Sequence, residues 1–454
     1  MAEGGESVFP QEVKTILARL EDAGFAAYIV GGCVRDLLMG RTPEDWDMTT
    51  SARPEQVMAL FAGHCIPTGL QHGTVTVREN HLSFEVTTFR ADGDYADHRH
   101  PSAVRFSDTL AEDLQRRDFT VNAMAMDLRG ELTDLYGGRE DIRNRVIRCV
   151  GDPDKRFDED ALRIMRALRF ASVLGFTIAS ETAQSLRRER ELLHDIAVER
   201  IYVEMNKLLC GDGAADVLLT YPEVIGVFLP EILPCVGFDQ RNYHHCYDVW
   251  EHSVRAAAAA PKDAALRWTM LLHDAGKPAV FTQDGDGVGH FYGHAKVSVE
   301  LAGTALQRLK FPAAQQQQIL TLIEWHDRDI PRTEKSIRRA LNQLGAEGLR
   351  QLIAVKRADN MGQAEEFRWV QRELDKAEEI METLLVQDAC FSLKQLAIRG
   401  GDAAALGLQG AAIGEALRGA LEAVMEGKVP NDREALLQWL REQHTVLADG
   451  RGTC

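Results

Sequence analysis

One stretch near the N-terminus, residues 28–50 (YIVGGCVRDLLMGRTPEDWDMTT), constrains this chain more than any other. A short apolar run ends in Gly31 and Gly32 and is followed by CVRDLLMG, which is compatible with a helix. This order predicts a strand, a glycine turn and a helix N-terminus, where free backbone N–H groups and the helix dipole favour a phosphate. Arg35 adds a cation one turn into the predicted helix.

An Asp-Trp-Asp sequence follows. Asp45 and Asp47 flank Trp46, and the next residues, Met48 and two threonines, favour a strand. Residues i and i+2 of a strand face the same side, so we expect both carboxylates to point to one place. Two hard oxygen ligands beside a phosphate site suit Mg²⁺ in phosphoryl transfer. Glycine turns and Asp-x-Asp pairs are weak signals separately, but their combination predicts a catalytic site.

This stretch carries a family resemblance. GGCVRDLLMGRTPEDWDMTT resembles the signature of class II nucleotidyltransferases of the polymerase-β superfamily, the tRNA CCA-adding enzymes and their bacterial poly(A) polymerase relatives. The resemblance implies an α/β polymerase-β-like nucleotidyltransferase head followed by mostly α-helical domains.

Composition describes an ordinary multidomain globular chain. Its 454 residues are 45% hydrophobic and 27% charged, and no segment approaches the roughly 18 uninterrupted apolar residues of a membrane span. With no signal-peptide pattern and eight cysteines that lack CxxC spacing, we expect a cytoplasmic protein with reduced thiols and no membrane partner. The net charge of −17 argues against processive binding of long nucleic acid, and DNA is not an expected partner.

Two further segments match the family in the head. Residues 72–77 and 82–89 alternate like paired strands, and Glu85 in FEVTTFR matches the family's third carboxylate. For RRDFTVNAM, the resemblance implies that Arg117 contacts the nucleotide phosphates and Asp118 the ribose 2′-hydroxyl, with Asn122 also in the nucleotide site.

The intervening residues 91–113 are polar and punctuated by Gly and Pro, which predicts a mobile loop. The family places here a flexible loop that helps to switch from C to A addition. Its presence argues mildly against an enzyme that adds only CC.

A helix is predicted over 157–173, with Asp160 and Arg163 three residues apart on one face. Composition alone favours an intrahelical salt bridge. EDALRIMRALRF, however, resembles the family's protein-template motif, which implies that Asp160 and Arg163 read the base and that Arg166 belongs to the nucleotide site. A carboxylate that accepts from an exocyclic amino group and a guanidinium that donates to a ring nitrogen fit cytosine and adenine, whereas uracil and guanine present a carbonyl to the carboxylate.

A second constellation lies beyond residue 215. The order of His252, His273, Asp274 and Asp359 resembles the HD superfamily of metal phosphohydrolases, in which these four are metal ligands. Imidazole with carboxylate suits a transition metal better than Mg²⁺ alone. His294 and His326 resemble the additional ligands or phosphate contacts of that superfamily. Whether such a site hydrolyses anything is open.

We therefore predict a nucleotidyltransferase head (1–145), a helical neck with base recognition (146–215), an HD-type body (216–360) and a helical tail that contacts tRNA (361–454). The predicted reaction is addition of CMP, CMP and AMP to the tRNA 3′ end from CTP and ATP, with release of pyrophosphate. In it, Asp45, Asp47 and Glu85 hold two Mg²⁺ ions.

Three alternatives stay open. The first is a partial A-adding or CC-adding enzyme or a poly(A) polymerase, although a basic extension expected of the latter is missing from this acidic chain. The second is an HD phosphohydrolase with a vestigial transferase head. The third is a non-catalytic RNA-binding module, which would have no reason to keep both metal constellations.

Overall fold

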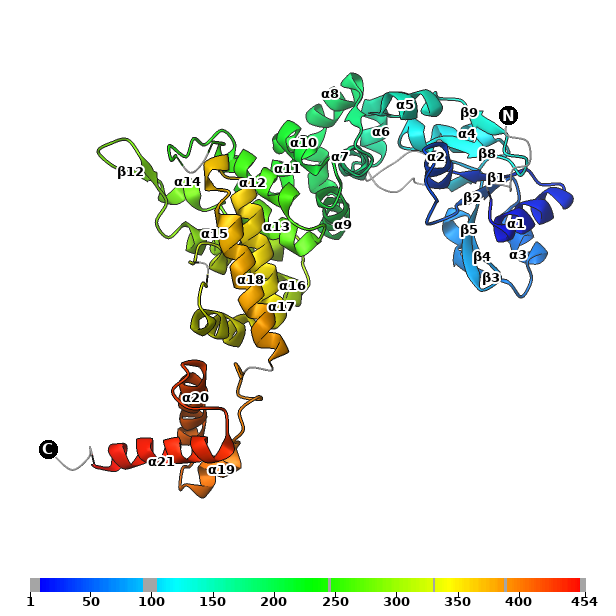
Figure 1. Cartoon of the computed structure of the whole chain (residues 1–454). Coiled ribbons are helices and arrows are strands. Elements are labelled where there is room, and N and C mark those ends of the chain that lie inside the picture. The colour runs from blue at the N-terminus through cyan, green and yellow to red at the C-terminus, as the bar shows by residue number, and fades with distance from the viewer. Residues whose placement is uncertain (1–8, 93–103, 244–245, 330, 388–389, 450–454) are drawn as a thin grey trace. The chain divides into compact units, whose positions relative to one another are not determined.

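The chain forms two compact units, residues 1–233 with 305–311 and residues 234–304 with 312–454 (Figure 1). The structure, a computed structural model, describes residues 9–92, 104–243, 246–329, 331–387 and 390–449. The predicted division into four domains is finer than these two units and stays a prediction. In the described ranges, no helix is long and apolar enough to cross a membrane.

The first unit is built on a seven-stranded mixed sheet with the order β3-β4-β5-β2-β1-β8-β9. Only β2 and β5 pair in parallel within it. The strands are β1 (Ala27–Val30), β2 (Met48–Thr50), β3 (Cys65–Gly69), β4 (Thr74–Glu79), β5 (Leu82–Thr88), β8 (Met124–Met126) and β9 (Leu132–Asp134). The predicted pairing of residues 72–77 with 82–89 is confirmed as the β4–β5 hairpin.

Two amphipathic helices complete the core beside this sheet. In α1 (Gln11–Asp22) the buried residues are Val13, Ile16, Leu17 and Leu20, at the i, i+3, i+4, i+7 spacing of one helical face. They share one apolar cluster with residues of β1, β2, β4, β5 and α3 (Pro54–Leu60). At about 1.5–3 kcal/mol for each fully buried large side chain, this packing fixes the strands that carry the candidate site.

Part of the segment predicted to be a mobile loop, 91–113, forms regular secondary structure. Residues 93–103 lie outside the described residues. On either side, β6 (Arg90–Asp92) pairs with β7 (Val104–Phe106), and α4 (Leu110–Gln115) begins at Thr109, whose hydroxyl accepts from the N–H of Glu112. The loop prediction is therefore wrong for residues 91–92, 104–106 and 110–113, where strand pairing and a capped helix fix the backbone.

The rest of the first unit is helical, with one short parallel strand pair. The predicted helix over 157–173 is wrong as a single helix, because the backbone at Asp160 is extended (φ −144°, ψ 99°). The elements are α2 (Gly32–Leu38), α5 (Gly138–Asn144), β10 (Val146–Ile147), α6 (Pro153–Glu159), α7 (Leu162–Leu174), β11 (Thr177–Ile178), α8 (Ser180–Arg188), α9 (Val198–Leu209), α10 (Ala214–Thr220) and α11 (Pro222–Phe228).

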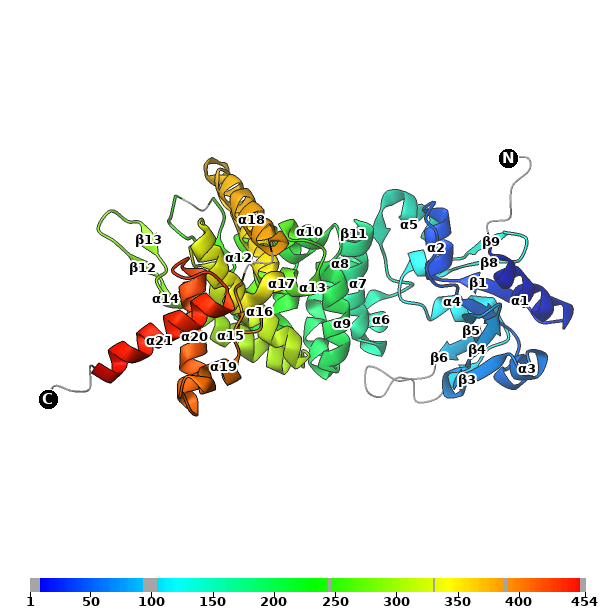
Figure 2. The ribbon, with the colours of Figure 1, turned by 60° about the horizontal axis from the view of Figure 1, so that its bottom comes forward.

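The second unit is almost entirely helical. A hairpin of β12 (Thr282–Gln283) and β13 (Gly289–His290) extends away from its helices in Figures 1 and 2. The helices are α12 (Val249–Ala259), α13 (Ala264–Leu272), α14 (Lys277–Val280), α15 (His294–Arg308), α16 (Ala313–His326), α17 (Glu334–Met361), α18 (Val370–Val386), α19 (Gly400–Ala405), α20 (Ala411–Met425) and α21 (Arg433–Asp449).

Apolar residues of α12, α13, α16, α17 and α18 form one cluster, and residues of α20 and α21 contribute to another. No disulfide bond joins any of the seven described cysteines.

Candidate active site and metal centre

Four carboxylates line one cavity of about 710 Å³ in the first unit, the predicted Asp45, Asp47 and Glu85 together with Glu44. Asp45 and Asp47 precede β2, which begins at Met48, so the prediction that both lie on a strand is wrong. Glu85 lies on β5, and the parallel register that pairs Met48 with Val86 brings it beside Asp47. The sheet therefore gathers the three carboxylates that the sequence singled out.

The pKa of Asp47 is raised above its ordinary value. Burial is the main cause that raises its pKa, the negative charges of Glu85 and Asp45 raise it further, and the Arg117 guanidinium opposes them. A cluster of carboxylates suits a divalent cation. The oxygens of the three carboxylates are not among the described groups whose ligand atoms all lie within 4.8 Å of one another.

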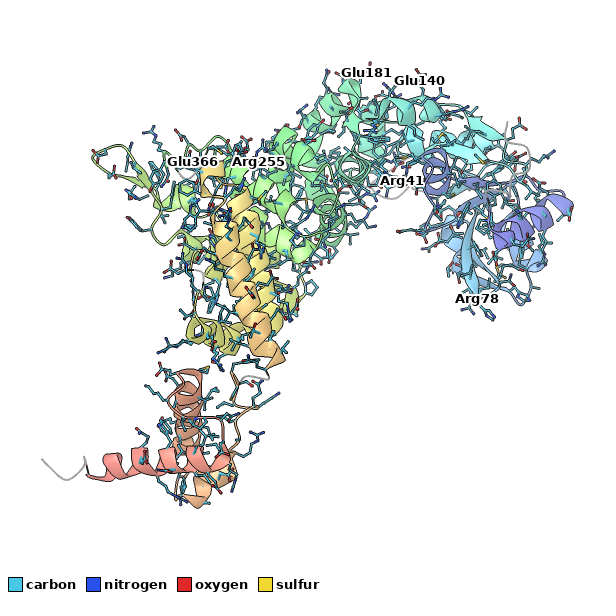
Figure 3. The ribbon with its side chains drawn as sticks, in the orientation of Figure 1. Arg41, Arg78, Glu140, Glu181, Arg255 and Glu366 are labelled. Carbon is cyan, nitrogen blue, oxygen red and sulfur yellow. The ribbon has the colours of Figure 1, made fainter. Side chains whose placement is uncertain are left out.

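A second cavity, of about 540 Å³, lies beside the glycine turn. Gly31 has φ 82° and ψ −128°, and a Cβ there would stand 2.9 Å from a terminal nitrogen of Arg117. Glycine is needed at this position because the backbone conformation and the arginine exclude a side chain. Gly32, the first residue of α2, and Arg41, which follows α2 and is labelled in Figure 3, line the same cavity. Glu44, Asp45 and Asp47 line both cavities.

Seven of the nine predicted nucleotide residues line this second cavity, whereas Asp160 and Arg163 do not line it. Arg35 donates to the side-chain oxygen of Asn122 at 2.8 Å, and Asn122 donates to Asp118 at 3.2 Å. Arg166 donates to Asp118 from two nitrogens, at 2.8 and 2.6 Å. Burial alone would raise the pKa of Asp118, but the charge and hydrogen bonds of Arg166 and the Asn122 bond lower it to about 2. Asp118 is therefore a fixed anion.

The predicted base-reading pair is arranged differently from the expectation. The prediction that Asp160 and Arg163 share a helical face is wrong, because α6 ends at Glu159 and α7 begins at Leu162. Arg163 is buried and donates to Glu159 at 2.6 Å and to the carbonyl of Arg116 at 3.0 Å. Asp160 instead accepts from the Leu162 N–H at 3.1 Å and from Arg200 at 3.5 Å.

Sequence reasoning missed Arg169. It lines the second cavity, pairs with Glu204 at 2.7 Å and lies 3.8 Å above the ring of Phe170. The signal was present in the three-residue spacing of Arg163, Arg166 and Arg169, which places arginines along neighbouring turns of α7.

The second unit brings together all six residues of the predicted HD site, from five different helices or their ends. His252 lies on α12, His273 and Asp274 follow α13, and Asp359 lies near the end of α17. The two further histidines complete the set: His294 begins α15 and His326 ends α16.

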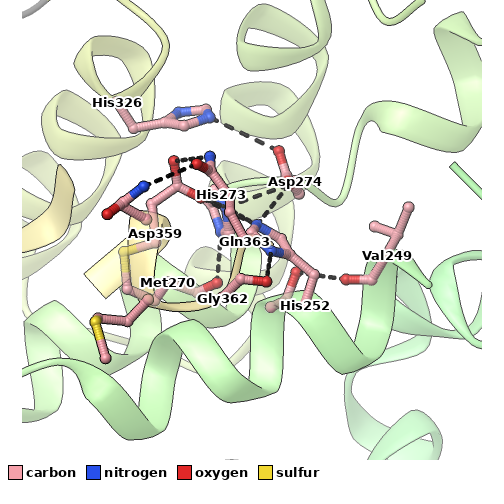
Figure 4. A network of polar contacts seen from close by, with 12 residues as sticks. Val249, His252, Met270, His273, Asp274, His326, Asp359, Gly362 and Gln363 are labelled. Carbon is pink, nitrogen blue, oxygen red and sulfur yellow. Dashed lines mark hydrogen bonds and ion pairs between the residues drawn. The ribbon is translucent and has the colours of Figure 1, made fainter. Parts of the chain in front are cut away.

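Asp274 is the centre of the cluster (Figure 4). Its Oδ2 lies 3.3 Å from Nε2 of His252 and 3.2 Å from Nε2 of His273, and Oδ1 of Asp359 lies 3.0 Å from Nε2 of His252. Its Oδ1 lies 3.2 Å from Nε2 of His294 and 3.7 Å from Nε2 of His326. One carboxylate thus joins two triads whose ligand atoms lie within 4.8 Å of one another.

Backbone carbonyls orient the histidine rings. Nδ1 of His252 lies 3.0 Å from the carbonyl of Gly362, and Nδ1 of His273 lies 2.6 Å from that of Met270 (Figure 4). His294 and His326 make the same kind of contact, with Phe291 at 2.9 Å and Ile323 at 2.6 Å. A proton held on Nδ1 by a carbonyl leaves the Nε2 lone pair for a metal, so the second shell of a metal site is present.

The donor set fits a metal ion. Oδ2 of Asp274 is buried and lies close to Nε2 of His252, to Nε2 of His273 and, at 2.7 Å, to Nζ of Lys277. Burial opposes protonation of His273, but the charges and hydrogen bonds of Asp274 and Asp359 raise its pKa to about 10. The two carboxylates therefore favour a positive charge at this position. Lys277 was missed from the sequence, although its spacing of three residues from Asp274 was the available signal.

Known protein families match the two parts of the chain that carry the candidate sites. Residues 27–148 match the family described as poly A polymerase head domain, and residues 242–380 match the HD domain. Residues 175–232 match a family described as the probable RNA and SrmB-binding site of polymerase A. The class is therefore a poly(A) polymerase-type head joined to an HD domain.

Individual relatives narrow this class. The crystal structure of the Bacillus stearothermophilus CCA-adding enzyme in complex with CTP is 33% identical, has a TM-score of 0.75, and its match covers 98% of this chain and 100% of that chain. The chain belongs to the CCA-adding enzyme family. A Thermotoga maritima CCA-adding enzyme complexed with tRNA, at 18% identity and a TM-score of 0.56, shares the fold.

Curated relatives are more similar over shorter stretches. The Lactobacillus helveticus CCA-adding enzyme is 55% identical over 196 residues, 43% of this chain and 49% of that protein. The Geobacillus stearothermophilus CCA-adding enzyme is 47% identical over 271 residues, 59% of this chain and 63% of that protein. The chain thus spans between half and two thirds of the length of these curated relatives.

Proposed function

We propose that this chain adds CMP, CMP and AMP to the 3′ end of tRNA, using CTP and ATP and releasing pyrophosphate. The observation that carries the proposal is the position of Asp45 and Asp47 on the shared edge of two cavities, with Glu85 beside them. A nucleoside triphosphate in the cavity beside Gly31 and a tRNA end in the other would meet at these carboxylates. Membership of the CCA-adding enzyme family supports the same activity.

In the proposed reaction the 3′-hydroxyl oxygen of tRNA bonds to the α-phosphorus. The bond from that phosphorus to the bridging oxygen breaks, pyrophosphate leaves, and the hydroxyl proton is released. Asp45, Asp47 and Glu85 would hold Mg²⁺, which when bound supplies charge that activates the hydroxyl and stabilises the leaving oxygens. Arg117 and the N-terminus of α2 would bind the phosphates.

Two other groups are assigned to nucleotide selection. Asp118, fixed as an anion by Arg166, would accept a hydrogen bond from the ribose 2′-hydroxyl. Asp160 and Arg163 would read the amino group and ring nitrogen of cytosine or adenine, with Glu159 holding the Arg163 side chain in place. A cytoplasmic location is part of this proposal.

The test of this function is the replacement of Asp47. Asp47→Asn keeps the shape of the side chain and removes its charge, so we expect incorporation of labelled CMP into tRNA transcripts to fall at least about 10³-fold. Glu55→Gln, on the exposed side of α3, is the matched control and should keep full activity. Incorporation by Asp47→Asn at the rate of the intact protein would refute the assignment.

A second function, hydrolysis of a phosphate ester at the HD cluster, is favoured by the two buried triads of possible metal ligands that Asp274 joins. In such a reaction a water oxygen bonds to phosphorus, the ester P–O bond breaks, and the leaving oxygen takes a proton. His252, His273, Asp274 and Asp359 would hold a transition metal, with His294 and His326 as further ligands.

A further inference from the structure

One aromatic side chain at the HD cluster has no part in the functions above. Tyr292 is 80% exposed, and it follows the β12–β13 hairpin and precedes His294 by two residues. It lines a cavity of about 440 Å³ together with Asp274, His294 and Asp359. This volume falls within the range of small-molecule sites. An exposed ring therefore stands at the edge of the candidate metal centre.

The Tyr292 ring is held in a defined orientation. It stacks on His290 with 5.4 Å between ring centroids and an interplanar angle of 7°. His290 is itself fixed by Asp284, whose carboxylate lies 2.9 Å from Nε2 of His290 and accepts from the Val288 N–H at 2.9 Å. Stacking on His290 restricts rotation of the Tyr292 side chain. The other face of its ring can therefore contact a ligand at a lower entropic cost than an ordinary surface side chain.

The same cavity carries charged groups of both signs. Lys277, Arg328 and Lys356 line it together with Asp327. Lys277 pairs with Asp274 at 2.7 Å, and Nζ of Lys356 donates to the carbonyl of His326 at 2.6 Å. Cations and a metal centre suit an anionic ester, whereas a rigid aromatic face suits a planar ring. A ligand that satisfies both is a nucleotide.

We propose that Tyr292 determines specificity at the HD cluster by stacking on the base of a nucleoside phosphate ester, whose phosphate lies at the cluster. This inference rests on the second proposed function for its catalytic consequence. The ligand is either a free nucleotide or the terminal nucleotide of an RNA, because both present the same base and phosphate.

The test compares ligands with and without a base. Calorimetry in the presence of a chelator measures the affinity of the full chain for three ligands. They are adenosine 5′-monophosphate, ribose 5-phosphate and a short RNA with a 3′-phosphate. Hydrolysis of the same three is then measured with Mn²⁺. We expect the base-bearing ligands to bind more tightly, and Tyr292→Ala to weaken them roughly 5- to 100-fold while ribose 5-phosphate is unaffected. If adenosine 5′-monophosphate binds more tightly than the RNA, the ligand is a free nucleotide; if the RNA binds more tightly, the ligand is the end of an RNA.

Three variants control this experiment. Tyr292→Phe keeps the stacking face and should retain binding. Tyr243→Ala removes a tyrosine that is 71% exposed in the same unit but does not line the cavity, and it should change nothing. Arg117→Ala alters the head site, so any binding that it removes belongs there.

The outcomes separate the two hypotheses. Unchanged binding and KM in Tyr292→Ala, with hydrolysis intact, would overturn the role of Tyr292 and leave the phosphohydrolase function standing. Binding that depends on Tyr292 without any hydrolysis would support the stacking role and contradict the phosphohydrolase function.

Discussion

At the scale of single residues, the candidate site depends on which partner each charged group has. Arg163 is the clearest case, since its guanidinium is held by Glu159 rather than by Asp160. A helix-face argument from three-residue spacing could not find this, because it assumes a continuous helix. The extended backbone at Asp160 redirects that side chain toward Arg200.

The base-reading assignment predicts a loss of selectivity rather than of chemistry. Asp160→Ala removes the acceptor for the exocyclic amino group, so we expect the ratio of kcat/KM for CTP to that for UTP to fall at least about 10-fold. Arg163→Ala should also loosen base choice and, because Arg163 is buried, lower the melting temperature. Unchanged discrimination in both variants would contradict the assignment.

The Asp118–Arg166 pair predicts a pH dependence of stability. The pKa of Asp118 is lowered from 3.8 to about 2, so its contribution is complete above the unfolded pKa and is lost as pH falls through the folded pKa. Between pH 5 and pH 3, urea unfolding of the intact protein should lose about 1 kcal/mol more than that of Asp118→Asn. Parallel losses in the two proteins would show that Asp118 is not held as an anion.

At the scale of elements, the strand–turn–helix around Gly31 could be predicted well. The apolar run, the glycines and the helix-compatible segment correspond to β1, the turn and α2, and the alternation around Glu85 corresponds to β5. The local pattern could not show that β2 begins only at Met48 or that α6 and α7 are separate, because both depend on packing rather than on composition.

Gly31→Ala tests the turn. The conformation at Gly31 is one that residues other than glycine rarely adopt, at a cost of about 1–3 kcal/mol, and the new Cβ would displace Arg117. We expect lower stability and a KM for CTP raised at least about 10-fold. Gly40→Ala, with φ +70° and nothing within 4 Å of the added Cβ, should lose stability but keep its KM. Equal KM changes in the two variants would refute the role of Arg117.

At the scale of the whole molecule, each of the two units carries its own candidate site. The order of His252, His273-Asp274 and Asp359 along the sequence predicted the ligands of the second unit. Because they come from helices far apart in the chain, only the fold could show that Asp274 joins two triads. Family resemblance, rather than spacing, supplied His294 and His326 as candidates.

Metal binding at the HD cluster should therefore stabilise the second unit. We expect Mn²⁺ at about 100 times its dissociation constant to stabilise that unit by about 2.7 kcal/mol and chelator to reverse the effect. Asp274→Ala should abolish the stabilisation and leave CMP incorporation unchanged. A loss of incorporation equal to that of Asp47→Asn would contradict the separation of the two sites.

The most direct test of the central claim is the length of the product made on three tRNA transcripts. These end at the discriminator base, after the first C, or after the second C, and are incubated with the purified protein, Mg²⁺, labelled CTP and ATP. We predict completion to CCA on all three, followed by a stop, resolved at single nucleotides. Extension of only the CC-ended transcript, addition of only CC, long A tracts, or no incorporation would each contradict the account.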